Sequence, residues 1–477
     1  MADIGIDFDD VQGTILRGYR VDFARHFVLS ITDATQARKT IAALIDGSDG
    51  LPKITTARRV RPKPAYFMNL SFTAPGLAAL GVDQAQLATF DKAFQRGAAD
   101  EKSTSVVGDV GSSAPEHWVG NLGAATQGGQ VHALLSVWVS ESTEVMEALS
   151  ARLRRAFAAG WRELYAHDAA ALPDNRVHFG YRDSIAQPDV DGAEERKHQE
   201  PHPANGVKTG EFLLGFENEN GGFYNAQPAQ LAANGSYAAF RILEQDVVGF
   251  EAMLARYADS TKLSAEMVAA KLCGRWRNGN PLVLAPDEAG HVLPTDRLNR
   301  FAYVNAKKPA LDDTLGLKCP IGSHIRRNNP RDESVTGTSA SHHRIVRRAM
   351  PYGREYDPAA PVAEARGLVG YFINASLTNQ FEFLMGQWND TDGFVKAATR
   401  PGDPDGDAGN ASLNISGEDI FLGVNDPQSS SFTLPGLGAK GSRNTTLQGF
   451  ARSITTRAGV YCFFPGIQGL RYLAALE

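Results

Sequence analysis

The sequence predicts an α+β protein built from two similar halves, each with a sheet that is covered by helices on one face. In both halves an apolar extended run is followed by an amphipathic helix, which is the pattern that such layers require. The chain has 477 residues, of which 43% are hydrophobic, so it can bury a large core. No glycine-rich turn follows the first strand, which disfavours the competing doubly wound sheet.

The strand–helix units follow from the alternation and spacing of apolar residues. In the first half we expect strands at residues 26–31, 65–72 and 131–139, and helices at residues 35–45 and 141–157. In the second half we expect strands at residues 237–242 and 368–373, and helices at residues 245–257 and through Phe381, Phe383 and Leu384. A polar, turn-rich stretch from Asn218 to Ser236 separates a domain of residues 1–225 from a domain of residues 226–477.

The charge balance and the cysteines limit the partners and the compartment. The formal net charge is −6 and the sequence pI is near 6.0, which disfavours nucleic acid or an anionic membrane as a partner. Cys273, Cys319 and Cys462 are too far apart for a disulfide framework or a CxxC zinc site, and are typical of buried thiols in a reducing compartment. The acidic N-terminus lacks the pattern of a signal peptide, so we expect a cytoplasmic protein without a membrane partner.

Two stretches contain candidates for catalysis or ligand binding. The first, Phe179 to Pro188, sets Asp183 beside an arginine, and this carboxylate is either an acid–base catalyst or part of an ordinary turn. The second, Cys319 to Arg331, places His324 before three arginines. A lone histidine is commonly a satisfied polar group and an arginine run a solvated face, yet a histidine ligand beside cations that neutralise two carboxylates is what a haem site needs.

The remaining polar stretches give weaker signals. An arginine pair, Arg347 and Arg348, precedes a turn that contains proline. His198 and His202 lie in a charged segment that is typical of an exposed loop, and His342-His343 lacks a third ligand at a useful spacing. The oxygen-rich loop 400–410 lacks the ligand order of an EF-hand, so we expect a solvated loop there.

Taken together, these stretches resemble the dye-decolourising peroxidase family over nearly the whole chain. The resemblance includes the stretch with Asp183, the stretch with His324 and the stretch with the arginine pair. It also includes four further blocks: Val11–Tyr19, Phe72–Gly81, Lys271–Leu282 and Phe381–Phe383. It implies two ferredoxin-like domains, each a duplicated antiparallel sheet with helices, that enclose one haem b per chain. The blocks occur in the family's order, which makes the resemblance stronger than any single block would.

The resemblance also implies a role for each candidate. Asp183 matches the distal acid–base of the family's GxxDG motif, His324 matches the ligand of the haem iron, and Arg331 matches an arginine that pairs with a haem propionate. Arg347 matches the distal arginine, with Arg348 as the second choice. The final glycine of the motif is Ser184 in this chain, where serine adds a Cβ and a hydroxyl group that could bond to Asp183.

The implied function is a haem peroxidase that reduces hydrogen peroxide and oxidises aromatic or dye-like donors in one-electron steps. The alternatives are a haem-binding protein without peroxidase turnover and, more distantly, a protein that binds no haem. Asp390 and Asp392 are candidates for the carboxylate that supports the histidine ligand. Trp388 and Tyr352 are candidates for a relay of electrons to the surface, although burial in the core is the more ordinary role of such rings. An oligomer is possible.

Overall fold

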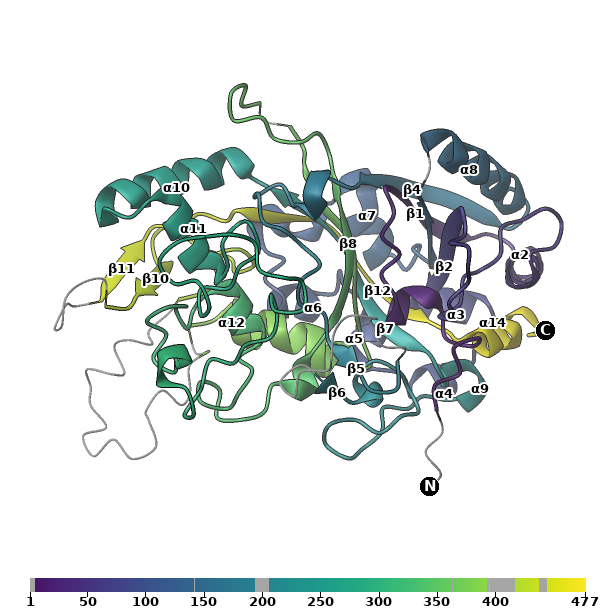
Figure 1. Cartoon of the computed structure of the whole chain (residues 1–477). Coiled ribbons are helices and arrows are strands. Elements are labelled where there is room, and N and C mark those ends of the chain that lie inside the picture. Colours follow the sequence, from purple (N-terminus) through teal and green to yellow (C-terminus); the bar gives the residue numbers. More distant parts are fainter. Residues whose placement is uncertain are drawn as a thin grey trace.

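A single antiparallel sheet of eight strands forms the centre of the computed structural model. The structure describes residues 5–140, 142–193, 206–362, 364–392, 394, 417–436 and 444–477. The strands of the central sheet follow the order β4-β1-β3-β2-β12-β7-β9-β8. The four strands β1–β4 come from the first half of the chain, and the other four come from the second half, so the two predicted sheets are joined edge to edge (Figure 1).

The bounds of the strands show where sequence patterns succeeded. β1 (Phe23–Ile31), β2 (Tyr66–Phe72), β3 (Ala133–Val139), β7 (Ser236–Gln245) and β9 (Gly367–Asn374) lie where strands were expected. β4 (Trp161–Ala170), β8 (Val346–Tyr352) and β12 (Ile454–Phe464) were not expected. β8 runs through Pro351, which the sequence suggested as a turn. Because β8 is an edge strand, the missing N–H of proline breaks no ladder hydrogen bond there.

Two contacts turn this sheet into a closed, barrel-like structure. β12 joins the two halves through the pairing of Phe463 with Phe72 of β2. At the other end, the ring of His167 on β4 lies 4.5 Å from the ring of Tyr352 on β8, so the first and last strands meet through side chains. The α+β class that the sequence predicted is confirmed, with one curved sheet in place of two separate ones.

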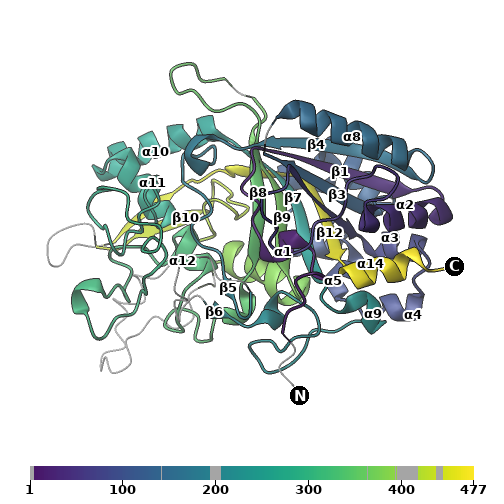
Figure 2. The same cartoon turned by 45° about the vertical axis from the view of Figure 1, so that its right-hand side comes forward.

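Helices cover the first half of the sheet, and a separate pair of helices stands beside the second half (Figures 1 and 2). α2 (Ala34–Asp46), α8 (Thr143–Phe157) and the C-terminal α14 (Ile467–Ala474) lie over the first half, whereas α10 (Val247–Thr261) and α11 (Ala265–Cys273) pack on each other in a second apolar cluster. Arg471 of α14 forms an ion pair of 2.8 Å with Asp46 at the end of α2. The last helix therefore packs on the first half of the chain, and the division at residues 225 and 226 stays a prediction.

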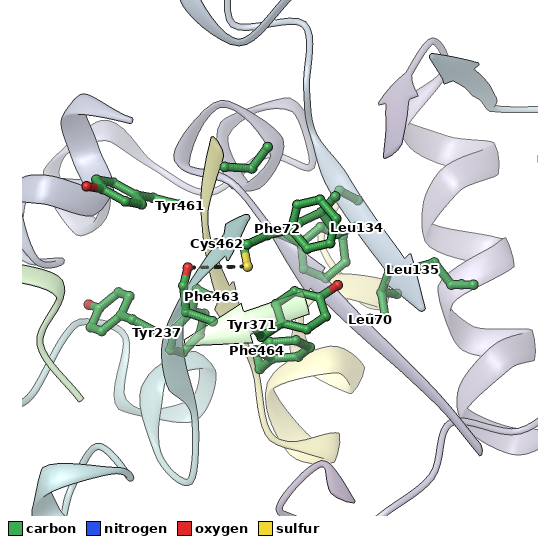
Figure 3. Close-up of a cluster of buried hydrophobic side chains, with 14 of the residues drawn as sticks. Leu70, Phe72, Leu134, Leu135, Tyr237, Tyr371, Tyr461, Cys462, Phe463 and Phe464 are labelled. Atoms are coloured by element: carbon green, nitrogen blue, oxygen red, sulfur yellow. Dashed lines mark hydrogen bonds between the residues drawn. The ribbon is translucent and has the colours of Figure 1, made fainter. Parts of the chain in front are cut away.

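The core of the sheet contains aromatic rings of the second half packed with aliphatic side chains and Phe72 of the first half (Figure 3). Phe463, Phe464 and Tyr371 are each at most 1% exposed, and the rings of Tyr371 and Phe464 lie 5.1 Å apart. Burial of one such ring stabilises the fold by roughly 1.5–3 kcal/mol. The three cysteines are all buried and free, and no helix among the described residues has the length and apolar character to cross a bilayer.

One helical segment departs from the expected geometry. The helix expected through Phe381 to Leu384 is present as η8 (Leu377–Glu382) and η9 (Leu384–Asn389), which have the wider turn of a π-helix. Such turns are rare and occur frequently at functional sites. The segment ends at Asn389, whose carbonyl accepts a hydrogen bond from Asp419 N at 2.7 Å.

Glu211 makes the stability of the fold dependent on pH. The residue is fully buried, its Oε1 accepts a hydrogen bond from Glu219 N at 2.9 Å, and its Oε2 has no partner within the described part of the chain. Burial raises the pKa of Glu211 from 4.5 to about 7. The folded state therefore holds the proton more tightly than the unfolded state, and stability falls as the pH rises from 4.5 to about 7.

We expect Glu211→Gln to remove this loss of stability. Relative to the variant, the wild-type protein should lose on the order of 3 kcal/mol between these two pH values, as measured by urea unfolding. Below pH 4.5 and above pH 7 the difference between the two proteins should stay constant, because both states then have the same protonation. Glu116→Gln, at an exposed position, is the control and should leave the pH profile unchanged. A profile that is equally steep in the Glu211→Gln variant would contradict the assignment.

Candidate functional site

His324 is the first residue of the short helix α12 (His324–Asn328) and is held by a buried carboxylate. Its Nδ1 lies 3.0 Å from Oδ2 of Asp419, which is fully buried. The side chain of His324 keeps 23% of its surface exposed, and its Nε2 has no hydrogen-bond partner among the residues that the structure describes. With the proton on Nδ1, the lone pair of Nε2 is free to bind a metal.

Asp419 is itself held rigidly by the main chain. Its Oδ1 accepts hydrogen bonds from the N–H groups of Phe421 at 2.9 Å and Leu422 at 2.8 Å. Burial raises the pKa of Asp419, but the neighbouring His324 and Arg327 outweigh burial, and the pKa of this carboxyl lies below its usual value. The carboxylate is therefore ionised and able to orient the imidazole.

The sequence did not identify this carboxylate. The candidates were Asp390, which instead accepts a hydrogen bond from Val424 N at 2.9 Å, and Asp392, which is exposed. Asp419 lies 95 residues from His324 in the sequence, so no local spacing could have indicated the pair. Both suggested partners are therefore wrong.

The arginines that follow His324 do not form a solvated face. Arg326 and Arg327 are fully buried. Arg326 donates to the carbonyl of Cys319 at 2.8 Å and lies over the ring of Tyr303 at 4.2 Å, while Arg327 donates to main-chain carbonyls that include that of Thr391 at 3.1 Å. These cations fix the loops around α12, and each is compensated by protein oxygens.

Asp183 lies in a loop that is anchored at its main chain. Asp183 N donates to the carbonyl of Asn175 at 2.8 Å, and Arg182 N donates to the carbonyl of Arg277 at 2.9 Å. The half-buried carboxylate of Asp183 has no hydrogen bond or ion pair with any residue in the described ranges. Asp183 is thus held in place through its backbone while its side chain remains available for a ligand.

Arg347 and Arg348 point away from each other, as neighbours on a strand do. Arg347 Nη2 donates to the carbonyl of Ala186 at 2.8 Å, so its side chain lies against the loop of Asp183. Arg348 Nε donates instead to the carbonyl of Thr14 at 2.9 Å, near the N-terminal helix α1 (Gly13–Leu16). Of the two, only Arg347 accompanies Asp183.

Arg344 is a further arginine of this region, and sequence reasoning did not single it out. Burial, together with the positive charges of Arg331 and Arg347, lowers the pKa of Arg344 to about 9. Arg331 Nη1 donates to the carbonyl of Phe301 at 2.8 Å, and its guanidinium lies 3.8 Å from the centre of that ring. The positive charges of Arg331 and Arg347 disfavour the charged form of Arg344, and an anionic ligand bound beside Arg344 would offset this effect.

The segment that joins α11 to the following loop connects the surroundings of His324 with those of Asp183. Ser323 Oγ donates to the carbonyl of Lys271 at 2.6 Å, next to His324. Six residues later, the carbonyl of Arg277 accepts the bond from Arg182 described above. Asp183 and His324 do not touch, but the residue before each of them bonds to the segment 271–277. This segment lies within the Lys271–Leu282 block that the sequence singled out.

The donor set fits a flat ligand that carries both a metal and carboxylate groups. His324 offers one free nitrogen and Asp183 offers an unpaired carboxylate, while Arg331, Arg344 and Arg347 supply positive charge. Haem has these requirements: an axial histidine, cations for its two propionates and a polar group near the open face of iron. The residues present therefore fit haem.

The remaining motifs do not add to this site. The ring of His343 stacks on the ring of Phe383 at 3.6 Å between centres. Within the described ranges, no three metal-ligating side chains lie together, so His343 belongs to no metal site there. Trp388 and Tyr352 are 4% and 7% exposed, so neither offers a surface to a bulky donor. His198, His202 and the loop 400–410 lie outside the described residues.

Ser184 occupies a backbone conformation that favours glycine. Its φ is +62°, and the side chain is exposed and forms no hydrogen bond with Asp183. Left-handed backbone costs a non-glycine residue about 1–2 kcal/mol. The family's glycine at this position is thus explained by backbone conformation in this chain.

We expect Ser184→Gly to stabilise the protein by up to about 1 kcal/mol, because the added freedom of the unfolded chain offsets part of the relief of strain. The change would be measured by urea unfolding. Ser184→Ala removes the hydroxyl group but keeps Cβ, so it should give no stabilisation. Equal stabilisation by alanine would show that the hydroxyl group, and not the backbone angle, is unfavourable.

Comparison with known proteins identifies the same architecture along the whole chain. A family model described as the DyP dimeric alpha+beta barrel domain matches residues 10–173. The chain is 28% identical to Peroxidase 2 of Mycetinis scorodonius over 98% of this chain and 88% of that protein. It is 29% identical to a dye-decolorizing peroxidase of Mycena epipterygia over 89% of this chain and 80% of that protein.

The likeness extends to three dimensions. A crystal structure of a fungal DyP-type peroxidase from Auricularia auricula-judae is 26% identical, superposes with a TM-score of 0.78, and covers 98% of this chain and 99% of that one. The match therefore includes the second half, which carries α12, β8 and Asp419, as well as the first. The family model, the curated relatives and the solved structures all support a peroxidase of the dye-decolourising type.

Proposed function

We propose that this chain is a haem peroxidase that reduces hydrogen peroxide and oxidises aromatic or dye-like donors in one-electron steps. It would hold one haem b, with His324 as a ligand of the iron and Arg331 as a cation that pairs with a propionate. The observation that carries the proposal is the contact of 3.0 Å between His324 Nδ1 and the buried carboxylate of Asp419. This contact leaves Nε2 free for iron and increases the electron density of the ring.

Asp183 and Arg347 would act on peroxide. When bound, haem would supply the two electrons that reductive cleavage of the O–O bond requires. Asp183 takes a proton from one oxygen of the peroxide and returns it to the other, which leaves as water. The guanidinium of Arg347 stabilises the negative charge that develops as the O–O bond lengthens. The hydrogen bond from Arg347 to Ala186 supports this assignment, because it keeps the guanidinium beside the loop of Asp183.

The donor is proposed to be a phenol or a related aromatic molecule. One dye-decolorizing peroxidase with the same fold has been solved in complex with 2,6-dimethoxyphenol. Because Trp388 and Tyr352 are buried, a relay that ends at either ring would not meet a large dye at the surface. The cytoplasmic location and the oligomeric state stay predictions.

A haem-binding protein without peroxidase turnover is the second candidate. Such a protein needs His324 and Arg331 but has no use for a carboxylate and a guanidinium held together on the other side. The bond from Arg347 Nη2 to Ala186, three residues after Asp183, therefore favours the enzyme.

We expect His324→Ala to lose most of its haem, because the alanine side chain cannot coordinate iron. Haem content is measured as the ratio of Soret to protein absorbance after purification with added haem. His342→Ala is the control. His342 is not one of the residues assigned to the haem site, so this variant should keep its haem. If the His324→Ala protein retained a five-coordinate histidine spectrum, another residue would be the ligand.

The two neighbouring arginines of β8 provide a matched pair of variants. Arg347→Leu should slow the reaction with hydrogen peroxide by on the order of 100-fold, because a charge that stabilises the transition state is lost. Arg348→Leu should leave this rate within about threefold of the wild-type rate, since Arg348 Nε bonds to α1, and the Arg347 carbonyl that Arg348 Nη1 also contacts keeps its hydrogen bond from Gln187. The rate is measured from the Soret change on rapid mixing with peroxide. The assignment fails if the two variants exchange these behaviours.

A further inference from the structure

We propose that Gln187 is a positioning residue that fastens the main chain of Arg347 to the loop of Asp183. The proposal rests on the function proposed above, in which Asp183 and Arg347 act together on peroxide. Gln187 is only 8% exposed and lies four residues after Asp183. Nothing about its type alone indicates this role; the inference depends on where its amide lies.

The side-chain amide of Gln187 bonds to both main-chain polar groups of one residue. Arg347 N donates to Gln187 Oε1 at 3.0 Å, and Gln187 Nε2 donates to the carbonyl of Arg347 at 3.2 Å. Arg347 Nη2 also donates to the carbonyl of Ala186 at 2.8 Å. Three hydrogen bonds therefore join the loop of Asp183 to the strand position of the distal arginine, and two of them involve the Gln187 side chain.

The position of Arg347 in the sheet explains why an amide is needed. β8 is the terminal strand of the central sheet, and only β9 pairs with it through ladder hydrogen bonds. The N–H group of Arg347 points outward from that edge and would otherwise lack a strand partner, while its C=O group points the same way and also accepts a hydrogen bond from Arg348 Nη1 at 3.1 Å. The amide of Gln187 offers one donor and one acceptor in the arrangement that a neighbouring strand would supply.

Fixing the backbone of Arg347 also fixes the starting point of its side chain relative to Asp183. A misplacement of about 1 Å in a catalytic group can reduce a rate by up to about 100-fold. Loss of the two amide bonds would allow the loop and the strand to move apart, while Asp183 and Arg347 themselves stay chemically intact. We therefore expect slower reaction with peroxide and an unchanged step with the electron donor.

The chain contains a matched control for this construction. Gln12 bonds in the same way to both main-chain groups of Leu70: Leu70 N donates to Gln12 Oε1 at 2.9 Å, and Gln12 Nε2 donates to the carbonyl of Leu70 at 2.7 Å. Gln12 is fully buried and directly precedes α1, while Leu70 lies on β2. Gln12 also donates to the carbonyl of Pro465 at 2.9 Å and accepts from Asn69 Nδ2 at 3.2 Å, and no hydrogen bond joins it to the site among the described residues. A change at Gln12 therefore imposes a structural loss at least as large without removing a bond of the site.

The experiment compares Gln187→Met with Gln12→Met, because methionine has a similar length and neither donates nor accepts a strong hydrogen bond. Amide hydrogen exchange, measured on the protein without haem, should become at least tenfold faster at Arg347 in the first variant and at Leu70 in the second. In the haem-loaded proteins, Gln187→Met should slow the reaction with peroxide by about tenfold. It should leave the rate of reduction by 2,6-dimethoxyphenol unchanged, and Gln12→Met should change neither rate.

Several outcomes would overturn the proposal. These are unchanged exchange at Arg347 in Gln187→Met, faster exchange there with an unchanged peroxide rate, or an equal loss of peroxide reactivity in Gln12→Met. If Gln187→Met does not fold, Gln187→Asn replaces it: its shorter amide can reach only one of the two groups, so faster exchange and a smaller loss of peroxide rate are expected. If the wild-type protein with haem does not react with peroxide, the proposed function fails. Amide hydrogen exchange at Arg347 then still shows whether Gln187 holds the main chain of Arg347.

Discussion

The arrangement of the site depends on burying one carboxylate next to one histidine. Asp419 is fully buried, and an ionised carboxylate in that position is tolerated only when its oxygens are compensated. His324, two main-chain N–H groups and the nearby charge of Arg327 provide this compensation. The same contacts fix the start of α12 and the direction of the imidazole ring. A change in any of them would therefore alter the ligand as well as the stability of the surrounding loops.

The arginines fall into two groups that the fold treats differently. Arg326 and Arg327 are buried among main-chain carbonyls and a carboxylate, and these contacts stabilise the loops around α12. Arg344 is buried as well, and the positive charges of the half-buried Arg331 and Arg347 disfavour its charged form. This repulsion is unfavourable without an anion, and the two propionates of haem would offset it. Residues 271–277 link the surroundings of His324 to the loop of Asp183. The carbonyl of Lys271 accepts a hydrogen bond from Ser323, and the carbonyl of Arg277 accepts one from Arg182.

The strands and helices with strong apolar patterns could be predicted from the sequence, and those with mixed patterns could not. β1, β3, β7 and β9 are buried along most of their length, so their apolar runs were visible. β4 and β8 are more exposed, and β8 combines two arginines with a proline. A proline is acceptable there only because β8 ends the sheet, and the order of strands is a property of the whole fold. The closing of the sheet into a barrel was likewise absent from any local pattern.

By itself, the sequence determined the α+β class, the resemblance to the dye-decolourising peroxidases and the segments that carry Asp183, His324, Arg331 and Arg347, because motifs and periodicity are local properties of the chain. Tertiary structure decided which carboxylate supports His324, since Asp419 is brought to it from 95 residues away. It also shows that the Arg347 side chain bonds to the loop of Asp183 while Arg348 Nε bonds to the main chain near α1, a difference that strand alternation alone does not assign. Contacts between distant segments depend on the position of every intervening element, and local residue patterns do not encode that position.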